Sequence, residues 1–240
     1  MTQLTIDSTN FPTREHYPFS LDLLQKTPAL DFVAPVTFFV GENGTGKSTF
    51  LKALAQRCDF QIWQDTERAR YRYNRYEEEL YKYIRVKWKN GPVPGSFFGS
   101  QIFQDFARFL DEWATGDPGI LEYFGGRSLL TQSHGQSLIT FFKARYKIKG
   151  LYLLDEPETA LSPRSQLELL RILKETTQDG HAQYIIASHS PILLAYPGAT
   201  IYSFDHSPVK PIQYRETAYY KLYKDFLDHP ERYLAGLERQ

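Results

Sequence analysis

Short apolar runs alternate with amphipathic stretches along this chain. Val36–Val40 (VTFFV) is a β-branched and aromatic run bounded by Pro35 and Gly41, which is the pattern of a buried strand. The segment from Lys47 to Arg57 then repeats apolar side chains at helical spacing. A strand, a glycine-rich turn and a helix are therefore predicted in that order.

The second half of the chain continues this alternation. Leu151–Leu154 and Gln183–Ala187 have the apolar composition of buried strands, and the stretch from Pro163 to about Thr177 between them has helical character. A fourth strand is predicted at Thr200–Phe204, before a helical, aromatic-rich tail. Strands and helices that alternate with short turns favour a parallel sheet with right-handed crossovers.

The middle of the chain has a different character. Residues 60–95 are dense in Arg, Lys, Glu and Tyr and end in a Gly/Pro cluster, so we predict an insertion there. Gln101–Ala114 repeats apolar groups at three- and four-residue steps, which predicts an amphipathic helix, and a second helix is predicted from after Ser133 to about Tyr146. We expect one domain over residues 1–240, with a helical subdomain over 96–148.

Composition narrows the class of protein. The 240 residues carry 28 Lys and Arg against 28 Asp and Glu, so any nucleic-acid contact must use a local basic patch. Cys58 is the only cysteine, which excludes an internal disulfide and agrees with a cytoplasmic location. The N-terminus lacks the pattern of a signal peptide, and no window approaches the roughly 18 apolar residues of a membrane span. We expect a soluble or peripherally attached protein.

The strongest chemical signal is a complete phosphate-binding loop between the first predicted strand and helix. It consists of Gly41, Glu42, Asn43, Gly44, Thr45, Gly46, Lys47 and Ser48, followed by Thr49. Its glycines let backbone N–H groups surround phosphate oxygens at a helix N-terminus. Lys47 is expected to reach the β- and γ-phosphates, and Ser48 to ligate Mg²⁺. ATP and Mg²⁺ are the predicted ligands.

Two further groups follow predicted strands. Asp155 and Glu156 come at the carboxyl end of an apolar strand, where ligands bind in open α/β sheets. Asp155 is predicted to hold Mg²⁺, and Glu156 to polarise the attacking water. His189, after the next strand, is a candidate contact for the γ-phosphate and that water, although a lone histidine there is often an ordinary polar residue.

The order of these motifs resembles that of the ABC-type ATPases. The phosphate loop is followed by Ser133-His134-Gly135-Gln136-Ser137, Asp155-Glu156-Pro157, Ala160-Leu161-Ser162-Pro163 and Ser188-His189-Ser190-Pro191. More narrowly, the chain resembles small stand-alone bacterial predicted ATPases of the AAA/ABC-like group, over about residues 15–58 and 95–237. The resemblance implies a P-loop NTPase of α/β class, with an ABC-like three-layer fold, a mainly parallel sheet and a helical insertion.

The resemblance also implies a site shared between two copies of the chain. In ABC-type enzymes a Leu-Ser-Gly-Gly-Gln signature contacts the γ-phosphate held by the opposite subunit. This chain has Gln132 in place of the leucine and His134 in place of the first glycine, while Ser133, Gly135 and Gln136 remain as candidate ligands. An ATP-dependent homodimer is therefore expected. The departure from the standard signature argues against transporter-type coupling.

Other assignments stay open. The segment Ala160–Pro163 is the expected interface loop, and it also reads as a capped helix start. Gln101 is the best placed candidate for the lid glutamine that contacts Mg²⁺, with Gln104 and a plain surface residue as alternatives. Tyr17 is a candidate for stacking on adenine.

The residues of the insertion allow three interpretations. Arg and Tyr alternate from Arg68 to Tyr76 and can follow a nucleic-acid strand, although a solvated helix with ion pairs is favoured. The insertion could equally serve as an arm that docks a partner. Three functional classes remain: an ATP-driven machine acting on nucleic acid or in a defence or repair complex, the ATP-binding subunit of a membrane permease, and a non-hydrolysing nucleotide-dependent interaction protein. Glu156 argues against the last.

Overall fold

The chain folds around two β-sheets in the computed structural model. The structure describes residues 1–62, 74–124, 126, 128, 130 and 134–235. The larger sheet has six strands in the order β5-β6-β7-β3-β8-β9, and all neighbours are parallel except β8 and β9. These strands are β3 (Val36–Val40), β5 (Gly95–Gly99), β6 (Gly150–Asp155), β7 (Ala182–Ala187), β8 (Thr200–Ser203) and β9 (Lys210–Ile212).

The smaller sheet is antiparallel. Its order is β2-β1-β4, with β1 at Gln3–Ile6, β2 at Ala29–Asp31 and β4 at Ile84–Lys87. Sequence patterning did not predict this sheet, because its strands have only three or four residues each and pair across long loops. It supplies a second apolar face opposite the large sheet.

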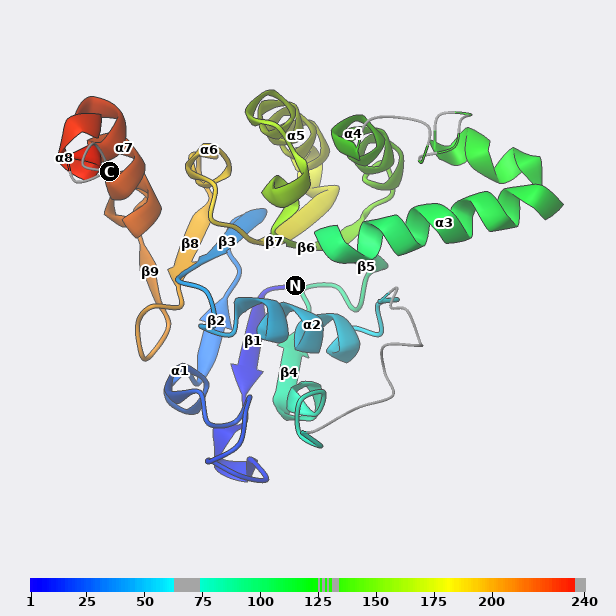
Figure 1. The fold of residues 1–240 in the computed structure, drawn as a ribbon. Coiled ribbons are helices and arrows are strands. Elements are labelled where there is room, and N and C mark those ends of the chain that lie inside the picture. Colours follow the sequence, from blue (N-terminus) through cyan, green and yellow to red (C-terminus); the bar gives the residue numbers. More distant parts are fainter. Residues whose placement is uncertain (63–73, 125, 127, 129, 131–133, 236–240) are drawn as a thin grey trace.

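Helices cover the large sheet on both faces. The described helices are α1 (Asp22–Lys26), α2 (Lys47–Arg57), α3 (Ser100–Gly116), α4 (His134–Arg145), α5 (Pro163–Thr176), α6 (Pro191–Leu194), α7 (Ala218–Asp228) and α8 (Pro230–Leu234). Short 3₁₀ turns are η1 (Ser8–Asn10), η3 (Leu80–Tyr83), η4 (Pro118–Phe124), η6 (Pro157–Ala160), η7 (Gln178–Gly180) and η8 (Tyr214–Glu216). Figure 1 shows α2 on the side of the small sheet and α3, α4 and α5 on the other side of the large sheet.

Alternation along the central strands explains this layering. In β6, Leu151 and Leu153 point into the core formed with α2 and the small sheet, while Tyr152 and Leu154 point into the core formed with α3, α4 and α5. Every residue of β3 is likewise buried. A strand buried on both faces reads as one continuous apolar run, which is why these strands were predicted correctly.

The predicted strands and helices of the large sheet are confirmed, within one or two residues at their ends. The range 60–95, predicted as an insertion, contains β4 and runs into β5. Its C-terminal part is thus built into both sheets, while residues 63–73 lie outside the described part. The domain boundaries stay predictions. Among the described helices, none combines the length and apolarity needed to cross a bilayer.

Candidate nucleotide site

The predicted phosphate loop joins β3 to α2. Gly44 and Gly46 have φ of 82° and 94°, a left-handed conformation that favours glycine. Lys47 is only 4% exposed, and its Nζ donates to the carbonyl oxygens of Gly41 at 2.7 Å and Glu42 at 2.9 Å. Burial lowers the pKa of Lys47, and the nearby Glu156 carboxylate opposes that shift. The ammonium is thus held inside the loop by carbonyls.

The tip of the loop is open to solvent. Glu42, Asn43 and Gly44 are exposed, while Thr45 is half-buried and its hydroxyl donates to the Glu42 carbonyl at 2.9 Å. The backbone N–H of Glu42 donates to Oδ1 of Asp205 at 2.7 Å. Sequence analysis missed Asp205, although its place directly after a predicted strand is the kind of position that carries site residues.

Ser48 and Asp155 come together at the start of α2 and the end of β6. The Ser48 hydroxyl donates to Oδ1 of Asp155 at 2.9 Å. Burial raises the pKa of Asp155, and the hydrogen bond from Ser48 opposes that shift. One hydroxyl and one carboxylate are oxygen donors of the kind Mg²⁺ takes, with its other positions filled by phosphates and water. The described residues hold no cluster of three or more His, Cys, Asp or Glu that could bind a metal ion.

Glu156 has a backbone conformation that is unusual for its residue type. Its φ of 47° and ψ of 55° lie in the left-handed region, at a cost of about 1–3 kcal/mol. Its N–H donates to the Ala187 carbonyl of β7 at 3.0 Å, which fixes the turn. Oε1 of Glu156 then lies 3.1 Å from Nε2 of His189. Two residues predicted separately therefore form one pair.

The carboxylate of Glu158 holds the segment that carries His189 through hydrogen bonds. Oε1 of Glu158 accepts hydrogen bonds from the Ser188 hydroxyl at 3.0 Å and from the His189 N–H at 2.5 Å. Within the described residues, its Oε2 is buried without a hydrogen-bond partner. Burial raises the pKa of Glu158, while these hydrogen bonds oppose the shift. Sequence analysis assigned Glu158 no role.

Two tyrosines distant in sequence reach the loop. Tyr17, the predicted adenine contact, forms a hydrogen bond with the hydroxyl of Thr49 in the first turn of α2. Tyr219, from α7, contacts both Nδ1 of His189 and the carbonyl oxygen of Gly41. Nothing in the local sequence marked Tyr219, because it lies in a helix 178 residues away from Gly41.

Known proteins resemble this chain in one segment of its sequence and in its fold. A family model described as "AAA domain, putative AbiEii toxin, Type IV TA system" matches residues 136–195. The solved structure of cbiO1 from Clostridium perfringens, part of the ABC transporter complex cbiONQ, superposes with a TM-score of 0.51 at 17% identity, over 95% of this chain and 96% of that one. The chain has the α/β fold of the ABC-type P-loop ATPases.

A second solved structure has the same fold. An inward-facing putative metal-chelate type ABC transporter matches with a TM-score of 0.51 at 19% identity, over 90% of this chain and 85% of that one. At such identities the likeness concerns the fold alone. A search of the curated proteins found no match.

The predicted signature segment is described only in part. Gly135 and Gln136 lie in the first turn of α4, whereas Ser133 lies outside the described residues. A Cβ added to Gly135 would lie 3.4 Å from the carbonyl oxygen of Ala160, so the start of α4 packs against the predicted interface loop. Gln101 and Gln104 belong to α3, and their side chains lie outside the described part, so the lid assignment stays a prediction.

The interface loop also forms the predicted capped helix start. Ser162 accepts a hydrogen bond from the Ser165 N–H at 3.2 Å, and Pro163 occupies the first position of α5.

Among the residues predicted as an Arg/Tyr surface, Arg75 lies over the ring of Tyr76 at 4.6 Å from its centroid. Residues 75–78 form a turn rather than a helix, and Tyr76 stacks on His16. This tyrosine packs against its own chain, and residues 68–73 lie outside the described part.

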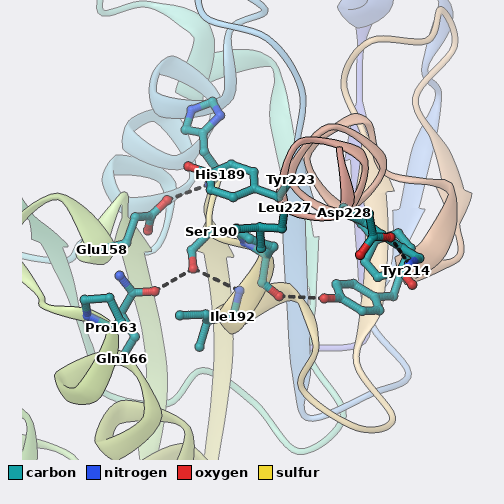
Figure 2. Close-up of a pocket in the computed structure, with 13 residues that line it drawn as sticks. Glu158, Pro163, Gln166, His189, Ser190, Ile192, Tyr214, Tyr223, Leu227 and Asp228 are labelled. Atoms are coloured by element: carbon teal, nitrogen blue, oxygen red, sulfur yellow. Dashed lines mark hydrogen bonds and ion pairs between the residues drawn. The ribbon is translucent and has the colours of Figure 1, made fainter. Parts of the chain in front are cut away.

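A pocket of 580 Å³ borders the candidate site on the side of α7. Figure 2 shows Glu158, His189 and Ser190 on one wall and Tyr223, Leu227 and Asp228 on the other. The Ser190 hydroxyl donates to Oε1 of Gln166 at 2.5 Å and accepts from the Ile192 N–H at 3.1 Å. These contacts fix the turn after His189.

Proposed function

We propose that this protein hydrolyses ATP with Mg²⁺ at a composite site formed by an ATP-dependent, head-to-tail homodimer, and that hydrolysis drives conformational work on a partner in the cytoplasm. The observation that carries the proposal is the approach of Glu156 to His189, at 3.1 Å between Oε1 and Nε2, beside the loop that holds Lys47. An acidic residue with a strained backbone beside a phosphate loop is typical of a catalytic position.

Binding comes from the loop. Lys47 exchanges its two carbonyl acceptors for phosphate oxygens, and the N-terminus of α2 adds its partial positive charge. Ser48 and Asp155 would hold Mg²⁺, which would supply charge neutralisation at the phosphates. We assign the contact with adenine to Tyr17, which is hydrogen-bonded to Thr49.

Hydrolysis uses the paired side chains. Water attacks the γ-phosphorus, the bond from that phosphorus to the β,γ-bridging oxygen breaks, and ADP and phosphate are the products. Glu156 accepts the proton of the attacking water, and His189 donates a hydrogen bond to the γ-phosphate. General-base assistance of this kind contributes about 10²- to 10⁴-fold to a rate.

A second copy completes the site. Ser133, Gly135 and Gln136 of that copy supply a hydroxyl and backbone donors at the start of α4. The packing of Gly135 against Ala160 supports this, because one chain's signature and interface loop would then face the partner together. The exposed loop tip at Glu42–Gly44 leaves the γ-phosphate side open to that partner.

The partner on which hydrolysis acts is a nucleic acid or a protein of a defence or repair complex. The matched family model's description names a putative toxin of a type IV TA system, which supports a defence role. The non-standard signature weighs against a membrane permease. DNA or RNA that stimulates turnover in a salt-sensitive manner supports the first class, and copurification with a polytopic membrane protein supports the permease.

The test is Mg²⁺-dependent phosphate release by the wild type, Glu156→Gln and the matched control Glu175→Gln, which changes an exposed residue of α5. We expect a loss of at least about 100-fold in Glu156→Gln with ATP binding retained, and no change in the control. An unaltered rate in Glu156→Gln would contradict the role given to this carboxylate.

A further inference from the structure

Helix α7 brings a tyrosine to the edge of the nucleotide site. The helix begins after Thr217, whose fully buried hydroxyl accepts a hydrogen bond from the Tyr220 N–H at 3.2 Å. This cap fixes the first turn of α7, and Tyr219 lies in that turn, half-buried. A residue fixed in this way can hold a neighbouring side chain in one orientation.

The contacts of Tyr219 reach two parts of the site at once. Its hydroxyl forms a hydrogen bond with Nδ1 of His189 and lies 3.2 Å from the carbonyl oxygen of Gly41, to which it can donate. Its ring meets the imidazole edge to face, with centroids 4.9 Å apart and planes at 78°. The other ring nitrogen, Nε2, lies 3.1 Å from Glu156. The imidazole is therefore held at both nitrogens.

We propose that Tyr219 is a positioning residue for ATP hydrolysis: its hydroxyl fixes the ring of His189 so that Nε2 faces Glu156, and it links that pair to the phosphate loop at Gly41. The inference rests on the proposed function, because the pair acts in hydrolysis there. Tyr219 acts through His189 and makes no contact of its own with the phosphates or the attacking water.

Hydrogen-bond chemistry explains why a hydroxyl is needed. A phenol has one proton to donate and lone pairs with which to accept. When Tyr219 donates to Nδ1 of His189, the ring proton is on Nε2 and points at Glu156 or at a γ-phosphate. When Tyr219 donates to Gly41, it accepts from Nδ1–H instead. The position of this one phenol proton therefore selects the nitrogen of His189 that can donate.

The surroundings keep the phenol in its donor form. Burial raises the pKa of Tyr219 to about 12, and the Glu42 and Asp205 carboxylates act in the same direction. The carboxylates of Glu156 and Glu158 add to that effect. The hydroxyl thus remains protonated throughout the pH range of an ordinary ATPase assay.

The first experiment compares Tyr219→Phe with Tyr220→Phe. The first variant keeps the ring that packs on His189 and removes only the hydroxyl. The second removes the hydroxyl of the next tyrosine in α7, whose ring packs on Tyr214 instead. We expect Tyr219→Phe to lower kcat by about 5- to 10-fold with KM for ATP unchanged, the effect of one lost hydrogen bond in the transition state. An unchanged kcat, or an equal loss in Tyr220→Phe, overturns the proposal.

A double-mutant cycle separates positioning from a structural role. We expect Tyr219→Phe to lower kcat no further in a His189→Ala background, because the hydroxyl acts through that ring. Equal losses in both backgrounds overturn the inference. If His189→Ala alone leaves kcat unchanged, the role of His189 in the proposed function fails. If it lowers kcat and Tyr219→Phe does not, only the present inference fails.

The wild type allows a test without any substitution. The imidazole ¹⁵N resonances of His189 report which nitrogen carries the proton and whether each is hydrogen-bonded. We expect the Nδ1 shift of a hydrogen-bonded nitrogen, and a change in that shift in Tyr219→Phe. The shift of a free nitrogen in the wild type contradicts the proposal even if the variant fails to fold.

Discussion

The hydroxyl of Ser48 and the carboxylate of Asp155 meet at 2.9 Å, across 107 residues of sequence. The contact joins the first turn of α2 to the end of β6. It depends on the parallel pairing of β6 with β7 and of β7 with β3, because the carboxyl ends of these strands lie at one edge of the sheet. Magnesium ligands predicted from two separate motifs are thereby adjacent.

Asp155→Asn tests this adjacency. The amide keeps one oxygen but loses the charge, so we expect the Mg²⁺ concentration for half-maximal ATPase activity to rise by at least about 10-fold. The control is Asp117→Asn, which changes an exposed carboxylate after α3. A titration of phosphate release with Mg²⁺ measures both. An unchanged Mg²⁺ requirement would remove Asp155 from the metal site.

Lys47→Ala tests the binding role of the buried ammonium. Because hydrogen bonds to charged groups are worth about 1.5–3 kcal/mol, we expect ATP affinity to fall by about 10- to 100-fold. Arg57→Ala removes a basic side chain from the exposed end of the same helix and should leave affinity unchanged. Equilibrium binding of a fluorescent ATP analogue distinguishes the two variants. Equal affinities would mean that the loop binds phosphate without Lys47.

Gly46→Ala tests the geometry of the loop. The φ of Gly46 is 94°, and an added Cβ would lie 2.6 Å from Cδ1 of Leu21. We expect a loss of about 1–3 kcal/mol in unfolding free energy, together with weaker ATP binding. Gly116→Ala is the control, since a Cβ there meets nothing within 4 Å. Urea denaturation of both variants gives the comparison. If Gly46→Ala is as stable as the wild type, a side chain at this position causes no strain, which contradicts the prediction.

Glu158→Gln tests the pKa of the buried carboxyl group that accepts hydrogen bonds from Ser188 and His189. Burial raises the pKa of Glu158 above its ordinary value of 4.5, so the folded state binds this proton more tightly than the unfolded state. Stability from this group is present at low pH and is lost as pH rises from about 4.5 through the folded pKa. The glutamine of Glu158→Gln does not titrate, so the variant does not lose this part of its unfolding free energy as pH rises.

We therefore expect the difference in unfolding free energy to shift in favour of Glu158→Gln as pH rises from 4.5 to neutrality, when urea denaturation is measured across that range. The control is Glu175→Gln, at an exposed position of α5. A difference that does not vary with pH would mean that the pKa of Glu158 is the same in the folded and unfolded states.

Particular residues show where sequence reasoning succeeds. Val36–Val40 and Gly41 to Ser48 are local patterns, so a strand, a turn and a helix were predictable from adjacent residues. The two-sided burial of β6 and β7 follows from the apolar runs Leu151–Leu154 and Tyr184–Ala187. A strand, a turn and a helix that follow one another in one short segment can be predicted from sequence.

Other features depend on contacts between distant segments. The small sheet pairs Leu4 with Leu30 and with Val86, and no turn motif links these strands. Tyr219 contacts Gly41 only because β8 and β9 carry the chain back across the sheet to α7. Since no local periodicity encodes such pairings, the small sheet and the tyrosine could not be predicted from the sequence.

The most direct test of the composite site is the solution mass of Glu156→Gln with and without ATP and Mg²⁺, measured by analytical ultracentrifugation. A site that binds ATP but hydrolyses it slowly should trap the assembled state, because the γ-phosphate is the group both copies contact. We predict a monomer without nucleotide and a dimer with ATP and Mg²⁺. A variant that binds ATP and stays monomeric would contradict the shared site.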